Sequence, residues 1–209
     1  MDLRNAAAET PTLLAAVGLA GGARAVWASQ VHGVEVVHVS QPPAAGAAPV
    51  ADALVTATPS VLLVTRHADC PPVLLWDETR RVVGLVHSGR RGTYGGVAVR
   101  ALQRMQEWYG CTPEEVIASI GPGVRRCCYE VSLDALPPKG LGERRLEERD
   151  GAIYVDLQGL IGDGLRAAGV RTIYGEDDGE CTVCGPTAWH SYRRDRTTAR
   201  FAAVAGLSS

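Results

Sequence analysis

The sequence has little of what nucleic-acid binding or membrane insertion requires. It carries 21 basic and 23 acidic residues among 209, a net charge of −2, so no basic field is present to hold a phosphate backbone. No stretch approaches the ~18 apolar residues of a membrane span, and the N-terminal segment lacks the basic start and apolar core of a secretory signal. We therefore expect a cytoplasmic protein that binds neither nucleic acid nor membrane.

A disulfide framework is also not expected. Without a secretory signal, the six cysteines are better interpreted as thiols, packing residues or ligands. Cys181 and Cys184 form a C-x-x-C pair, but no second such pair exists, so we predict two thiols in a loop. Cys127 and Cys128 are adjacent, cannot easily bridge each other, and are predicted to be packing residues.

What is present is apolar material for one buried domain, because 46% of the residues are hydrophobic. Valine-rich runs bounded by glycine, proline or polar residues predict strands at 25–31, 34–39, 53–55, 60–65, 73–75, 82–86, 116–120, 153–157 and 173–174. Helical spacing or capping predicts helices at 13–19, from Thr93 to Gly110, at 159–169 and at 197–207. The charged segment 137–151 is expected to be irregular. The pattern indicates a mixed α and β domain.

Three residues typical of metal sites follow strand-like runs. His32, Cys70 and His87 each come just after an apolar segment and just before glycine or proline, where the backbone turns and a side chain can point into a cleft. Two imidazoles and one thiolate suit a zinc-type ion, and three protein ligands leave a fourth position for water or substrate. Their long spacings match no local metal motif, so a packing cysteine and hydrogen-bonded histidines remain the alternative.

Asp69 stands next to Cys70 and has two possible roles. It could hold a histidine ligand by the second ring nitrogen, or it could cap a turn. Cys181 and Cys184 are expected to take no part in the site.

Seven motifs occur in the order found in one known family. They are QVHG at 30–33, ADALVT at 51–56, ADCPPVLL at 68–75, GLVHSGRRGT at 84–93, IGP at 120–122, CYEV at 128–131 and SYRRD at 191–195. From about residue 13 to the C-terminus, the sequence resembles the laccase-domain family, formerly labelled polyphenol oxidases. Its members are regarded as purine nucleoside phosphorylases with adenosine deaminase and methylthioadenosine phosphorylase activity.

The resemblance implies Zn²⁺ held by His32, Cys70 and His87. It also implies an α+β fold of packed mixed β-sheets flanked by helices, in α/β/β/α layers, forming a single catalytic domain over residues 1–209. Two departures stand out. Arg90 replaces the tryptophan of the usual His-Ala-Gly-Trp-Arg-Gly motif, and the N-terminus looks shortened relative to the family.

The implied reaction is phosphorolysis of adenosine, inosine or methylthioadenosine, so the expected partners are purine nucleosides and phosphate. A zinc ion with two histidines and one thiolate carries a net charge of about +1, and Arg90 or Arg91 could contact phosphate, unless both simply lie solvated on the turn. The same metal could support deamination of adenosine. Asp69, Glu130 and His67 are all eligible to move the proton.

Three alternative functions differ in what they require of the sequence. Multicopper oxidation conflicts with the presence of only five histidines, none in a His-x-His pair. A cysteine hydrolase would use Cys70 as nucleophile and His87 as base. A zinc-stabilised binding module without turnover would also fit the altered second histidine motif and the shortened N-terminus.

Overall fold

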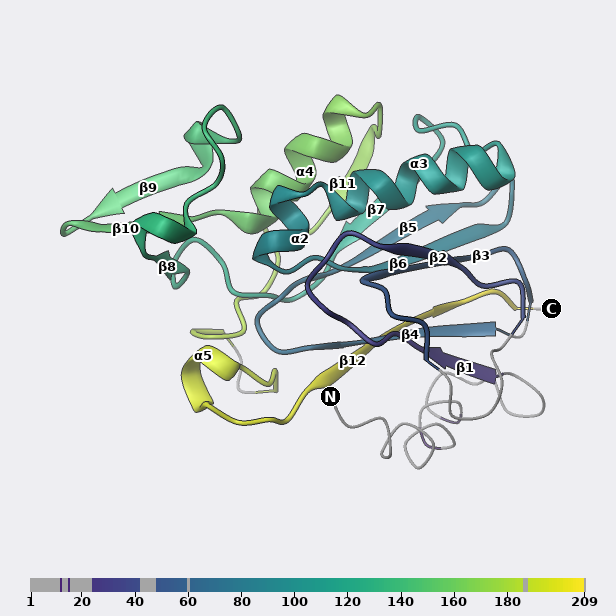
Figure 1. Cartoon of the computed structure of the whole chain (residues 1–209), viewed down its shortest axis with the longest axis horizontal. Coiled ribbons are helices and arrows are strands. Elements are labelled where there is room, and N and C mark those ends of the chain that lie inside the picture. Colours follow the sequence, from purple (N-terminus) through teal and green to yellow (C-terminus); the bar gives the residue numbers. More distant parts are fainter. Residues whose placement is uncertain are drawn as a thin grey trace.

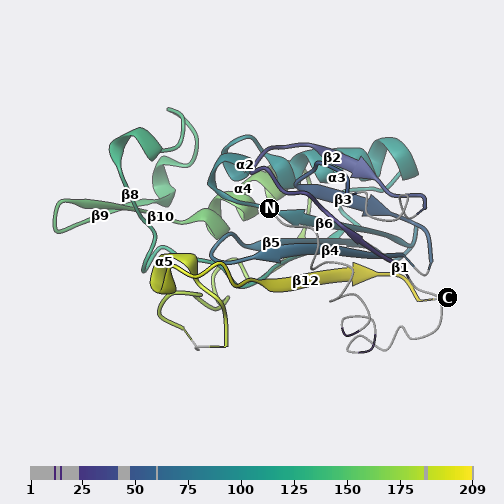
Figure 2. The same ribbon diagram turned by 60° about the horizontal axis from the view of Figure 1, so that its bottom comes forward.

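Two β-sheets lie face to face, and helices cover the outer face of the larger one (Figure 1). This computed structural model describes residues 12, 15, 24–41, 48–59, 61–185 and 188–208. Seen from a second direction, the helices, the large sheet and the small sheet form three successive layers (Figure 2). The predicted α+β class with packed mixed sheets is confirmed. The helix predicted at 13–19 lies, except for Ala15, outside the described residues.

The large sheet is mixed and has the strand order β11-β7-β5-β6-β3-β2. β5 pairs antiparallel with both β6 and β7, whereas the edge strands β2 and β11 pair parallel with their neighbours. All six residues of β6 are buried because the strand has helices on one face and the small sheet on the other. The strands are β2 (Val36–His38), β3 (Ala53–Thr56), β5 (Pro72–Asp77), β6 (Val82–His87), β7 (Ile117–Ile120) and β11 (Thr172–Tyr174).

The small sheet corrects one prediction. Its central strand β4 (Val61–His67) pairs parallel with β1 (Arg24–Trp27) and antiparallel with β12 (Phe201–Gly206). The tail at 197–207 was predicted to be helical, and this prediction was wrong. Alanine-rich composition favours a helix, but six residue pairs with β4 override that local preference. The inner face of this sheet packs against the large one through a shared apolar core.

The longest helix, α3 (Val97–Tyr109), packs its apolar face on β3 and β6. It ends at Gly110, as predicted, where a positive φ of 67° suits glycine. Its beginning differs from the prediction, because the N-cap is Gly96 and not Thr93. Thr93 lies within the preceding short helix α2 (Arg90–Tyr94), where its hydroxyl contacts Ser88. The remaining helices are α4 (Leu157–Ala167), confirmed near its predicted position, and α5 (Tyr192–Asp195).

A third sheet projects from one end of the molecule (Figure 1). It has the order β8-β10-β9, with β8 (Glu130–Val131), β9 (Leu146–Arg149) and β10 (Ala152–Val155), and it is accompanied by the 3₁₀ helices η1 (Leu133–Ala135) and η2 (Glu143–Arg145). The segment 137–151 was predicted to be irregular, but it contains β9. Asp150 and Gly151, both with positive φ, form the two-residue turn that pairs β9 with β10.

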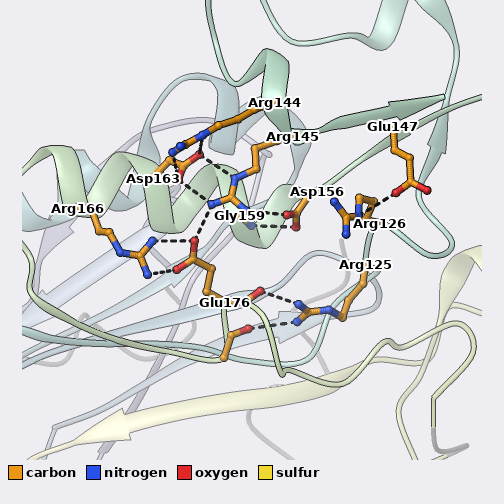
Figure 3. A network of polar contacts seen from close by, with 11 residues as sticks. Arg125, Arg126, Arg144, Arg145, Glu147, Asp156, Gly159, Asp163, Arg166 and Glu176 are labelled. Carbon is orange, nitrogen blue, oxygen red and sulfur yellow. Dashed lines mark hydrogen bonds and ion pairs between the residues drawn. The ribbon is translucent and has the colours of Figure 1, made fainter.

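A network of arginines and carboxylates attaches this projection to the rest of the fold (Figure 3). Arg145 forms ion pairs with Asp156, Asp163 and Glu176, which joins η2 to α4 and to the segment after β11. Arg125 donates hydrogen bonds to the carbonyls of Gly175 and Glu176. Within the described residues, no helix is long and apolar enough to cross a bilayer.

Candidate functional site

His32, Cys70 and His87 converge, as the sequence predicts. His32 lies in the turn after β1, Cys70 follows β4, and His87 is the last residue of β6. One ligand atom from each lies within 4.8 Å of the other two, a range that includes the roughly 4 Å expected around a metal ion. The two imidazole rings meet edge to face, with their centroids 4.8 Å apart.

Asp52 orients both histidines, and the sequence analysis assigned it no role. Its carboxylate is fully buried and accepts a hydrogen bond from Nδ1 of His87 at 2.8 Å. It also accepts the backbone N–H groups of Val31, His32 and Gly33, which fixes the turn in which His32 adopts a φ of 60°. Because Nδ1 of His87 is occupied, Nε2 is the ring nitrogen available to a ligand. The sequence signal for the role of Asp52 was a single acidic residue at the start of an apolar strand.

The ionisation of the cluster favours the thiolate of Cys70. Burial opposes it, but hydrogen bonds from His32 and His87 lower the pKa of Cys70 to about 6. Burial likewise opposes the charged imidazole, yet Asp52 and Cys70 raise the pKa of His87 to about 9. Without a metal ion, the cluster therefore holds a thiolate beside an imidazolium between about pH 6 and pH 9. The thiolate is the form of cysteine that binds metals.

Gly89 leaves the space in which the three side chains meet. A Cβ atom there would lie 2.9 Å from Sγ of Cys70 and 2.9 Å from Cδ2 of His32. Any larger residue would push these two ligands apart. Two imidazole nitrogens and one thiolate, held together in this way, are a donor set that fits a borderline-soft divalent ion.

The cluster opens into a cavity of about 930 Å³, the size of a small-molecule site. Several arginines line it, among them one of the two predicted phosphate ligands, Arg90, whose guanidinium also donates to the carbonyl of Ala135. Arg91 is not among the lining residues. It is exposed and donates to the carbonyl of Val31. The other lining arginines are Arg66, Arg193, Arg196 and Arg200.

Asp69 braces loops at the edge of the cavity. It accepts hydrogen bonds of 2.7 Å from the hydroxyls of Thr182 and Ser191 and from the backbone N–H of Arg193. These contacts agree better with the predicted capping role of Asp69 than with its predicted contact to a ligand histidine. The contact to a ligand histidine is made by Asp52 instead.

Neither His67 nor Glu130, the other two residues predicted to move the proton, presents a free group to the cavity. His67 is buried, and burial together with the neighbouring His87 lowers its pKa to about 3. Its Nδ1 donates to the carbonyl of Cys70 and its Nε2 accepts from Thr65, so both nitrogens are occupied. Glu130 is exposed on β8 and does not line the cavity.

Four further cysteines form a second cluster. Cys181 and Cys184 take no part in the first one, as predicted, but they meet Cys127 and Cys128 with all four sulfurs within 4.8 Å of one another. The predictions of loop thiols and packing residues were therefore incomplete. The two pairs lie far apart in the sequence, so spacing alone did not reveal that they meet.

Comparison with known proteins places the chain among relatives of similar fold. A purine nucleoside phosphorylase of Deinococcus radiodurans is 40% identical over 99% of this chain and 79% of its own length, and purine nucleoside phosphorylase Rv2149c of Mycobacterium tuberculosis is 40% identical over 95% and 78%. The crystal structure of YlmD from Geobacillus stearothermophilus matches with a TM-score of 0.83 and 32% identity over 95% of this chain and 78% of that one. Bacillus licheniformis YfiH, a hypothetical protein, also matches with a TM-score of 0.83, at 27% identity over 94% and 79%.

The family model described as multi-copper polyphenol oxidoreductase laccase matches residues 2–208. This match spans both sheets, the cavity and all three converging ligands, and the relatives above agree with it over nearly the whole chain. The chain therefore belongs to the laccase-like family that this model describes.

Proposed function

We propose that this protein is a zinc-dependent purine nucleoside phosphorylase whose metal ion is held by His32, Cys70 and His87. The observation that carries the proposal is the meeting of two imidazoles and a thiolate at an arginine-lined cavity. Relatives about 40% identical over most of this chain bear the name purine nucleoside phosphorylase, which supports the same activity here. Adenosine, inosine and methylthioadenosine are the proposed substrates, with phosphate as the second substrate.

Three protein ligands suit a catalytic metal site because they leave one coordination position free. A zinc-type ion bound here supplies a Lewis acid of net charge about +1 and an open coordination position. His32 and Cys70 border the cavity directly, and Asp52 holds His87 at the correct angle from behind. The protein's part is to fix these groups before the substrate arrives, which lowers the cost of organising them in the transition state.

The arginines of the cavity are the proposed phosphate subsite. Arg90 lines the cavity close to the cluster, and Arg66 contributes buried Nε and Nη2 atoms that have no hydrogen-bond partner within the described part of the chain. Such buried donors favour an anionic oxygen acceptor. Val124, Tyr129 and Leu157 supply apolar surface for a purine ring. The cavity thus offers both donors for an anion and apolar surface for a base.

Asp69 is proposed as a positioning residue. Three donors occupy its carboxylate, and they come from the loops that carry Thr182 and Arg193. Because the side chain of Arg193 lines the cavity, fixing these loops fixes part of the substrate's surroundings.

Adenosine deaminase activity at the same centre is a second proposed activity. It would use water instead of phosphate as the nucleophile, and a zinc-type ion held by His32, Cys70 and His87 would supply the activation of that water. The arginines that bind phosphate are then not needed. Deamination should therefore proceed without phosphate.

The direct test is product analysis. The purified protein is incubated with adenosine, inosine and methylthioadenosine, each with and without phosphate, and the products are identified by mass. Formation of ribose 1-phosphate from inosine only when phosphate is present supports the proposal, and inosine formed from adenosine supports the deaminase activity. Absence of turnover with all three nucleosides would favour a metal-stabilised binding module.

A cysteine hydrolase is the rival enzyme, since Cys70 and His87 form a thiolate and imidazolium pair. Metal dependence separates the two possibilities. Turnover by a hydrolase persists in metal-free protein and stops on alkylation of Cys70, whereas phosphorolysis requires the metal. The five histidines, without a His-x-His pair, disfavour multicopper oxidation despite the family's description.

A further inference from the structure

Four thiols meet at a place that the proposed activity does not use. Cys127 and Cys128 lie in the turn that follows β7, and Cys181 and Cys184 lie in the loop before α5. Their sulfurs are all within 4.8 Å of one another, and those of Cys127 and Cys184 are 3.5 Å apart. All four are free cysteines.

The fold holds these two loops together independently of the thiols. Gly123 and Cys181 form a parallel β-bridge, and the N–H of Thr182 donates to the carbonyl of Gly123 at 3.1 Å. A Cβ atom at Gly123 would lie 3.0 Å from the carbonyl oxygen of Asp69, so glycine permits this close approach. Arg125 anchors the first loop to Gly175 and Glu176 (Figure 3).

The spacing of the sulfurs suits a shared metal ion. Four thiolates at about 2.3 Å from a tetrahedral zinc ion are separated by about 3.8 Å, whereas a disulfide brings two sulfurs to about 2.05 Å. The separation of 3.5 Å between Cys127 and Cys184, and the bound of 4.8 Å on all the others, lie closer to the tetrahedral value than to that of a disulfide. An all-thiolate donor set is typical of structural zinc sites, which have no open position.

The loop of Cys181 resembles the tight turns on which C-x-x-C ligands are carried. The N–H of Gly185 donates to the carbonyl of Cys181 at 2.9 Å and closes the turn.

One arginine side chain lies against the loop that carries Cys127. The guanidinium of Arg149 donates to the carbonyls of Arg126 and Cys127. Four thiolates on a divalent ion would carry a net charge of about −2, for which a guanidinium at this loop is a favourable neighbour.

We propose that Cys127, Cys128, Cys181 and Cys184 bind a second, structural metal ion of the zinc type, separate from the ion at His32, Cys70 and His87. This ion ties the loop carrying Tyr129, which lines the cavity, to the loop carrying Thr182, which donates to Asp69. The second site thereby supports one wall of the substrate cavity without touching the substrate.

The test measures metal content and cobalt spectra in variants of the full chain. Cys70→Ser removes the thiolate of the first site, so any sulfur-to-cobalt bands that remain report on the second site alone, whether or not the protein is a phosphorylase. We expect this variant to retain about one metal equivalent per chain and, when loaded with Co²⁺, to show thiolate-to-cobalt charge-transfer bands and the intense visible bands of tetrahedral all-sulfur coordination.

The matched variants remove thiols elsewhere. Adding Cys184→Ser to Cys70→Ser should abolish these bands, whereas adding Cys111→Ala, which removes a thiol from the main core, should leave them unchanged. Because a variant can fail to fold, the spectrum of Cys70→Ser alone is decisive. Absence of sulfur-to-cobalt bands in folded Cys70→Ser would overturn the proposal. A disulfide between Cys127 and Cys184 in freshly purified protein, seen by mass, would also overturn it.

Discussion

At the scale of single residues, the site depends on a carboxylate that does not itself face the substrate cavity. Asp52 is fully buried and accepts hydrogen bonds from the ring of His87 and from three backbone N–H groups. Burial raises its pKa, but the contacts with His87 and with the backbone of Gly33 and Val31 outweigh this and lower it, so the side chain stays ionised at neutral pH. One residue thus sets both the tautomer of one ligand and the backbone of another.

We expect Asp52→Asn to weaken metal binding by about 10- to 100-fold, because His87 loses the acceptor that orients it. Competition with a chromophoric chelator measures the affinity, with Glu130→Gln, an exposed carboxylate outside the cavity, as the control. Equal affinities in wild type and Asp52→Asn would mean that Asp52 only stabilises the turn.

The two arginines of the divergent motif should behave differently. We predict that Arg90→Ala weakens phosphorolysis by about 1.5 to 3 kcal/mol, the range for a charge-assisted hydrogen bond, while deamination changes less. Arg91 was an equal candidate in the sequence, but it is not among the residues that line the cavity. Because its side chain is exposed and turned to Val31, we expect Arg91→Ala to stay within about 0.5 kcal/mol of wild type.

Steady-state rates at several phosphate concentrations distinguish these variants. A rise in the KM for phosphate confined to Arg90→Ala supports the assignment. A rise confined to Arg91→Ala would show that the exposed arginine moves to the anion. If neither variant alters the phosphate dependence, the anion subsite lies with the other arginines of the cavity.

The convergence of His32, Cys70 and His87 was predictable from the sequence at this scale because each follows an apolar strand and precedes a turn residue. The motif that contains Asp52 was recognised, but the role of Asp52 was not. Nothing in the local sequence distinguishes a carboxylate that orients a distant histidine from one that caps a turn. The thiols of Cys127 and Cys184 were missed for a related reason, since their meeting depends on two loops brought together by the fold.

At the scale of elements, short turns at strand ends position the chemistry. β4 and β6 end side by side with Cys70 and His87, and the turn after β6 contains Gly89, against which Cys70 and His32 pack. The packing of these turns is too tight for a side chain at residue 89.

Gly89→Ala should therefore lower metal occupancy while leaving the fold intact. Its new methyl group would lie 2.9 Å from Sγ of Cys70, closer than real Cβ contacts allow. The matched control is Gly96→Ala, which has a φ of 74° and no neighbour within 4 Å, so it should cost about 1 kcal/mol of stability and leave the metal in place. Metal analysis beside thermal unfolding of both variants tests this, and full occupancy in Gly89→Ala would contradict it.

Elements also show where local patterns mislead. β12 has a helix-like composition and became a strand because β4 presented a free edge to it. β9 is charged and was expected to be irregular, yet Asp150 and Gly151 are a recognised hairpin signal that the charge pattern obscured. Most other strands were predictable because valine-rich runs bounded by turn residues have few alternatives in a buried sheet.

At the scale of the whole molecule, the stacking of two sheets places three strand-associated turns around one cavity. The packed mixed sheets, the α+β class and the meeting of His32, Cys70 and His87 follow from the sequence and its family resemblance, whereas the projecting sheet and the network of Arg145 do not. Those features depend on ion pairs between distant segments, for which no local pattern exists.

The central claim is that metal at His32, Cys70 and His87 carries phosphorolysis. The most direct measurement removes metal with a chelator, then follows ribose 1-phosphate formation from inosine and phosphate while Zn²⁺ is returned, in wild type and in Cys70→Ser. We predict that activity is lost in the metal-free protein, returns in wild type in proportion to the metal bound, and stays absent in Cys70→Ser at every Zn²⁺ concentration. Undiminished phosphorolysis by the metal-free protein, or full activity of Cys70→Ser, would contradict the account.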